Sequence, residues 1–184
     1  MAGVFQEIVM PAYIFTLLLL SVTMGMAHAS YQGSGKATLT GEIVEAACSI
    51  ATDDVWQEIN FGAVPLSDFA DGNEPAGKPF HIRLQNCVLD KASGGIWQDV
   101  IVTFDGNTQS NQHDMFSMTG DGQGIGVKIT DETGHKVIPG QPLPSVQLYE
   151  DNTNLHFNIH LARNNENLTS GNLSSYIRFM VAYQ

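Results

Sequence analysis

Basic residues are scarce in this sequence. Its 184 residues include 8 Lys and Arg against 19 Asp and Glu, which gives a formal net charge of −11. A surface that follows a nucleic-acid backbone needs Lys and Arg clustered along one face to meet the phosphates. So few basic residues, spread along the chain, cannot build such a stripe. The composition therefore argues against nucleic acid as a partner.

Apolar runs long enough to cross a membrane are missing as well. A spanning helix needs about 20 apolar residues, whereas the apolar stretch from Tyr13 to Val22 has about half that length. A stretch of this size followed by the small-x-small sequence Ala27-His28-Ala29 is typical of a signal peptide and its cleavage site. The segment before it departs from the usual pattern, since it carries no Lys or Arg. We expect residues 1–29 to be a signal peptide, and we expect no membrane insertion of the mature chain.

Cysteine is rare too, with 2 residues in the whole chain and no Cys-x-x-Cys motif. This excludes the usual pattern of a thioredoxin-like redox site. In an exported protein, a single pair more often forms a structural disulfide than a redox centre. We therefore predict a Cys48–Cys87 disulfide, which would close a loop of about 40 residues.

After the leader, no window shows a sustained helical period. Short β-like runs are separated by turn sequences such as Asp105-Gly106-Asn107 and Thr133-Gly134. Regularly spaced strands without intervening helices are typical of a sandwich or barrel. We predict an all-β, immunoglobulin-like domain. Its expected strands are Ile43–Ile50, Glu58–Phe61, Phe80–Leu84, Val100–Phe104, Ile125–Thr130, Leu155–Leu161 and Tyr176–Tyr183.

The segment after the leader has its own pattern. From Ser30 to Thr40, small or apolar residues alternate with polar ones, which is the period of a β-strand. Glycine inside a strand leaves little side chain to pack, so this segment would hardly hold a place in its own sheet. An extended arm is the better interpretation.

Catalytic, metal and cofactor motifs are not evident. His156 and His160 lie on an expected strand, where four residues span about 13 Å, too far for one metal ion. We interpret them as solvent-facing. The alternating glycines Gly120, Gly122, Gly124 and Gly126 lack the strand-to-helix context of a dinucleotide site, and we interpret them as a flexible loop that enters a strand. We expect no enzyme activity, no metal site and no cofactor.

Several segments together resemble the chaperone-usher pilins, the subunits of type 1-like fimbriae. The resemblance lies in residues 41–48 and 80–87, each ending in a cysteine, in residues 102–106 and in the hairpin at 126–134. Its most specific part is the C-terminus, where Gly171 and the penultimate Tyr183 stand where pilins carry a glycine and a tyrosine. The match covers nearly the whole mature chain.

The resemblance implies an immunoglobulin-like β-sandwich that lacks its last strand. Residues 41–184 would form this pilin domain, and residues 30–40 an N-terminal donor strand for a neighbouring subunit. The side chains that would enter the neighbour's groove are Tyr31, Gly33, Gly35, Ala37 and Leu39, with Gly35 over its constricted part. The groove edge would be the C-terminal strand, represented by Gly171, Ile177, Phe179, Val181, Tyr183 and Gln184.

The resemblance also implies the partners. They are a periplasmic pilus chaperone that anchors the terminal carboxylate, an outer-membrane usher and neighbouring pilin subunits. The expected function is that of a structural subunit, major or minor, of an adhesive fimbria exported through the periplasm to the bacterial surface. The alternative is a self-contained secreted immunoglobulin-like module that binds carbohydrate through Trp56, Trp97 and Tyr149, although such aromatic residues more often pack into cores.

Overall fold

Side chains alternate between buried and exposed along the strands of the computed structural model, which describes residues 35–41, 45–72, 74–109 and 112–184. In β2 (Lys78–Cys87), Ile82 and Leu84 are fully buried, whereas the neighbouring His81 and Arg83 are not. The same period appears in β3 (Asp99–Gly106), where Val100, Val102 and Phe104 are buried. Each sheet therefore has one apolar face.

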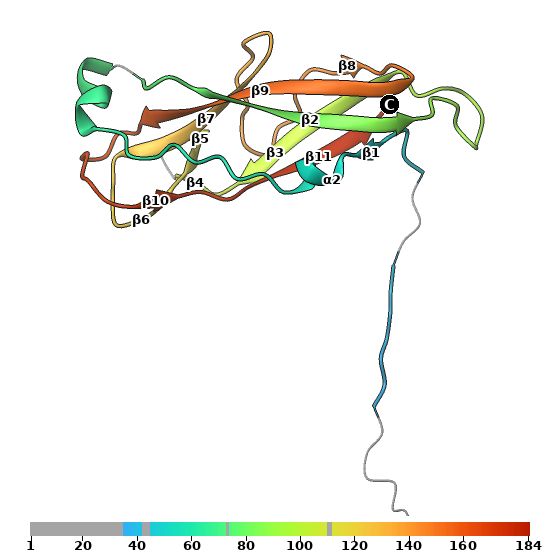
Figure 1. The fold of residues 1–184 in the computed structure, drawn as a ribbon, viewed down its shortest axis with the longest axis horizontal. Coiled ribbons are helices and arrows are strands. Elements are labelled where there is room, and N and C mark those ends of the chain that lie inside the picture. Colours follow the sequence, from blue (N-terminus) through green and yellow to red (C-terminus); the bar gives the residue numbers. More distant parts are fainter. Residues whose placement is uncertain (1–34, 42–44, 73, 110–111) are drawn as a thin grey trace, which may run out of the picture. The chain divides into compact units, whose positions relative to one another are not determined.

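The strands form two main sheets and a small third one, with antiparallel pairing throughout (Figure 1). The larger sheet has the order β1 (Ser49–Ile50), β2, β9 (Asp151–Arg163), β7 (Ile125–Asp131), β5 (Gln112–Ser117) and β4 (Thr108–Gln109). The second sheet has the order β11 (Ile177–Tyr183), β3 and β8 (Val146–Gln147). A two-stranded sheet joins β10 (Leu173–Ser174) to β6 (Thr119–Gly120).

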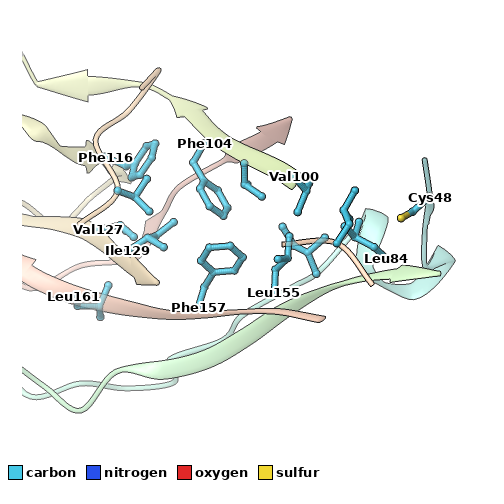
Figure 2. Packing of buried hydrophobic residues seen from close by; sticks show 14 of the residues in the cluster. Cys48, Leu84, Val100, Phe104, Phe116, Val127, Ile129, Leu155, Phe157 and Leu161 are labelled. Carbon is cyan, nitrogen blue, oxygen red and sulfur yellow. The ribbon is translucent and has the colours of Figure 1, made fainter. Parts of the chain in front are cut away.

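The core lies between the two main sheets. Phe104 of β3 and Phe157 of β9 meet edge to face with ring centroids 5.0 Å apart, and Figure 2 shows these two side chains pointing toward each other from opposite sheets. Phe116, Val127 and Ile129 extend the buried cluster along the larger sheet. The predicted all-β sandwich is confirmed.

The disulfide between Cys48 and Cys87 is also confirmed. It joins the segment that leads into β1 to the end of β2, next to the pairing of Ser49 with Gln85. The amide of Val88 donates a hydrogen bond to the carbonyl of Ala47 at 2.8 Å and continues this contact past the bridge. The bridge thus fixes one end of the larger sheet.

Two expected strands differ from the structure. The expected strand at Glu58–Phe61 is wrong, since these residues form no strand. The side chain of Asn60 accepts a hydrogen bond from the amide of Gly62 at 2.7 Å, and its carbonyl accepts one from Lys78 Nζ, so local contacts replace strand pairing. The expected strand at Ile43–Ile50 is shorter, because only Ser49 and Ile50 form β1 among its described residues.

Among the described residues, two short helical elements lie between the strands, α2 (Thr52–Val55) and the 3₁₀ helix η2 (Leu66–Gly72). In the part of the chain that the structure describes, no helix is long and apolar enough to cross a membrane. α2 is held by Asp54, whose side chain is only 3% exposed and receives hydrogen bonds from the backbone amide, Nε and a terminal nitrogen of Arg83. The hydrogen bond from the Arg83 side chain lowers the pKa of Asp54 and outweighs the opposing effect of burial.

Replacing Arg83 with Gln should lower the free energy of unfolding by about 2 kcal/mol at pH 7, because it leaves a buried carboxylate without its cation. We place the effect below that of a fully buried pair, since the Arg83 side chain is 37% exposed. A carboxyl group with a lowered pKa contributes stability above its ordinary pKa of about 3.9 and loses that contribution as the pH falls through the lower, folded-state value. The difference between parent and variant in urea unfolding should therefore shrink toward pH 3.

Arg178→Gln is the matched control. Arg178 also pairs with an aspartate, at 2.7 Å from Asp105, but its side chain is 79% exposed. Such a surface pair contributes about 0–1 kcal/mol. Equal losses in the two arginine variants would contradict the role given to Asp54.

Candidate functional site

The C-terminal strand β11 forms an edge of the second sheet. It pairs with β3 along its whole length, from Ile177 opposite Gly106 to Tyr183 opposite Val100. Among the described residues, no strand pairs with its other side (Figure 1). An open edge of this kind presents backbone N–H and C=O groups to which another strand can bind.

The inner side chains of β11 are only partly buried. Ile177, Phe179, Val181 and Tyr183 alternate with the exposed Arg178, Met180 and Ala182, and all four inner residues pack against the core cluster. Their neighbours on β3 are buried far more completely, with Val100 at 0%, Val102 at 3% and Phe104 at 2% exposure. The apolar core is therefore less completely covered at β11 than at β3.

Aromatic rings connect this edge with the other sheet. The ring of Phe179 lies 6.3 Å from that of Phe104, which in turn lies 6.0 Å from Phe80 of β2. Phe80 and Phe179 are both partly buried, whereas Phe104 between them is enclosed. These rings thus form an aromatic layer that runs from the middle of the edge strand into the core.

The end of β11 is anchored near the disulfide. The hydroxyl of Tyr183 donates a hydrogen bond to the carbonyl of Cys48 at 3.0 Å, and its ring lies 6.1 Å from Trp97. Burial raises the pKa of Tyr183. The amide of Gln184 donates to the carbonyl of Asp99 at 2.9 Å, and the amide of Gln98 donates back to the carbonyl oxygen of Gln184 at 2.8 Å. The side chain of Tyr183 is thus fixed to Cys48, and the backbone of Gln184 is fixed to Gln98 and Asp99.

The segment leading into β11 crosses another backbone very closely. A Cβ atom on Gly171 would lie 2.2 Å from the backbone nitrogen of Gly122, and one on Gly120 would lie 1.9 Å from the carbonyl oxygen of Asn172. The glycine run does lead into a strand, as expected, since β7 begins at Ile125, but its first glycines form a close crossing of two backbones and not a flexible loop. The sequence shows the glycine run and, about 50 residues later, Gly171. No local pattern indicates that these two segments lie against each other.

The residues predicted for the arm belong to a different part of the chain. The chain divides into two units, Met1–Glu42 and Ile43–Gln184. Tyr31, Gly33 and the expected signal peptide lie outside the described residues, whereas Gly35, Ala37 and Leu39 are described and are exposed, without helix or strand. Leu39 is 98% exposed. The described part of the arm therefore leaves its largest apolar side chain in solvent.

Comparisons with known proteins identify relatives of this chain. The profile of the family described as Fimbrial protein matches residues 37–184. A PRS fimbrial minor pilin protein of Escherichia coli is 32% identical over 168 residues, which cover 87% of this chain and 86% of the relative. A probable major fimbrial subunit, LpfA of Escherichia coli O157:H7, is 29% identical over 186 residues, which cover 97% of this chain and 100% of the relative.

Solved structures share the fold. The crystal structure of the P pilus rod subunit PapA superposes with a TM-score of 0.69 at 22% identity, over 76% of this chain and 100% of that one. A subunit in the structure of a chaperone-usher pilus, studied for the uncoiling of its rod, gives a TM-score of 0.67 at 24% identity, over 83% of this chain and 97% of that one.

Proposed function

The chain belongs to the fimbrial protein family, and from this premise we propose that it is a structural pilin subunit that accepts a strand from another polypeptide at the free edge of β11. The observation that carries the proposal is the combination of an unpaired edge with half-buried inner side chains on the same strand. A complete sandwich would bury those side chains as fully as those of β3.

The physics favours strand addition at such an edge. A strand laid beside β11 would pair the open backbone groups and cover Phe179 and its neighbours at the same time. Each larger apolar side chain that becomes fully buried contributes roughly 1.5–3 kcal/mol. Ordering an extended segment costs about 1–2 kcal/mol per residue, so the net gain is moderate and the durability of a fibre depends on slow release of the strand.

The donor is the arm, residues 30–40, of a neighbouring subunit. Tyr31, Gly33, Gly35, Ala37 and Leu39 would face the groove, and the residues between them would face solvent. The three small residues in the middle of this series suit an edge whose centre is filled by the rings of Phe179, Phe104 and Phe80. A shift by one residue would turn the polar set inward, so the alternation fixes the register.

The proposed route to the fibre follows from the same edge. A periplasmic chaperone covers β11 first and anchors the terminal carboxylate of Gln184, and an outer-membrane usher then exchanges the chaperone for the arm of the next subunit. The subunit thereby passes through the periplasm to surface fimbriae that support adhesion. Gly171 lies before this edge at the backbone crossing with Gly122, where it helps to position the start of the C-terminal segment.

Changing Gly35 to Leu tests the donor register. The larger side chain should clash with the filled centre of the groove, so strand donation between full chains should become several-fold slower, while chaperone binding stays unchanged. The measurement is the rate of oligomer formation from chaperone-bound subunits, followed by size-exclusion chromatography. Lys36→Leu is the control, since residue 36 is expected to face outward and should leave the rate near that of the parent. An unchanged rate for Gly35→Leu would reject the proposed register.

A further inference from the structure

Two histidines lie directly opposite each other on the outer face of the larger sheet. His81 of β2 is the register partner of His156 of β9, and their ring centroids are 6.5 Å apart. Both side chains point away from the core, since their strand neighbours Ile82 and Leu155 are buried. The sequence places His156 near only one other histidine, His160, which is too far along the same strand. The fold supplies a different and closer one.

The spacing of the two rings suits a shared metal ion. A metal–imidazole bond of about 2.0–2.1 Å places the metal about 3.2 Å from each ring centre. Two imidazoles on one ion therefore have centroids about 4.5–6.4 Å apart, depending on the angle between the bonds. The observed separation of 6.5 Å lies just above this range, so the two exposed side chains must rotate toward each other before both rings reach bonding distance.

A buried carboxylate stands behind one of the rings. Nε2 of His81 lies 3.7 Å from Oδ1 of Asp54, whose side chain is 3% exposed and fixed by Arg83. Gln57 Nε2 also donates a hydrogen bond to the carbonyl of His81 at 2.8 Å, which holds the backbone at that point. Metal-bound histidines commonly direct their second ring nitrogen to a carboxylate, which orients the ring and raises its basicity. At 3.7 Å the contact is longer than a hydrogen bond, and a small movement of the His81 ring would let Asp54 take this role and leave Nδ1 of His81 for the metal.

We propose that His81 and His156 form a two-histidine site for a first-row divalent transition metal, with Cu²⁺ bound most strongly. Imidazole nitrogen suits copper, nickel and zinc, and copper has the highest affinity in this series. Among the described residues, no group of three or more His, Cys, Asp or Glu side chains is placed to hold a metal, so the proposed site uses the two imidazoles as its protein ligands.

The site is separate from the proposed strand exchange. β2 and β9 belong to the larger sheet, whereas β11 is the edge of the second sheet. The two histidines face outward from the larger sheet, so a strand added beside β11 does not occupy the metal position. Failure of metal binding and failure of strand donation are consequently distinguishable.

The test is titration of the full chain with CuCl₂, followed by calorimetry and by electron paramagnetic resonance. His81→Gln and His156→Gln should each weaken Cu²⁺ binding at least tenfold, since even the partners behind the ligands change affinity by about 10–100-fold. The nitrogen hyperfine pattern should change from two imidazoles to one. The parent should also gain thermal stability when saturated with Cu²⁺, because the ion binds the folded state.

His160→Gln is the matched control, since it removes a histidine from the same strand without touching the pair. It should bind Cu²⁺ as the parent does. The substituted positions are partly or fully exposed, His81 by 46%, so these variants should remain folded. Parent-like binding by either His81→Gln or His156→Gln, or an equal loss in His160→Gln, would overturn the proposal.

Discussion

Replacing Cys48 and Cys87 together with alanine should lower the free energy of unfolding by about 3–4 kcal/mol. The bridge closes a loop with a sequence separation of 39 residues, and in the chain-entropy model a closed loop of this length restricts the unfolded state by about that amount. A single domain has about 5–15 kcal/mol of stability in total. The bridge therefore accounts for a large share of it.

The loss should be visible at the candidate site as well as in overall stability. Tyr183 of β11 donates its hydroxyl hydrogen bond to the carbonyl of Cys48, so the segment released by the substitution also holds the end of the edge strand. Urea unfolding measures the first effect, and hydrogen exchange of the β11 amides measures the second. The double variant should be insensitive to reductant, whereas reductant should bring the parent down to the same stability. A double variant as stable as the oxidised parent would refute this role.

The features that could be predicted from the sequence are those with a strong local period. Ile177, Phe179, Val181 and Tyr183 alternate with polar or smaller residues, and the structure turns this set toward the core. Similar alternation identified β2, β3, β7 and β9, although their ends extend beyond the expected ranges. The disulfide was predictable because only one pairing of two cysteines exists.

The features that could not be predicted depend on contacts between distant segments. Two-residue strands such as β8 and β10 carry no period of their own and exist because a partner backbone lies beside them. At the expected strand Glu58–Phe61, the side chain of Asn60 accepts a hydrogen bond from the amide of Gly62, and this local contact stands in place of strand pairing. The pairing of His81 with His156 likewise follows from the register between β2 and β9, which no local pattern encodes.

The open edge of β11 shows the same limit in a functional feature. The alternation of β11 would look the same in a sandwich with a further strand beside it, so the sequence pattern gives the inner face but not the number of neighbours. The burial values supply the missing information, since the inner residues of β11 are half-buried while those of β3 are enclosed. The proposed donor register rests on size, since it sets the small residues of the arm opposite the rings of Phe179 and Phe104.

Changing Gly171 to Ala should lower the free energy of unfolding by about 3 kcal/mol, the upper part of the usual range for overpacking. The new Cβ would lie 2.2 Å from the nitrogen and 2.7 Å from the Cα of Gly122, and 2.5 Å from the carbonyl carbon of Asp121. All three atoms belong to backbone, so no flexible side chain can move aside, and the pairing of β10 with β6 must open.

Gly41→Ala is the control for this substitution. A Cβ on Gly41 would meet nothing within 4 Å, so this variant should unfold in urea at nearly the same midpoint as the parent. Because the crossing lies just before β11, Gly171→Ala should also increase hydrogen exchange at Ile177 more than at Val181, which lies further along the strand. An unchanged unfolding midpoint for Gly171→Ala would show that the two backbones can separate without cost, and the close crossing would then have no part in holding the edge in place.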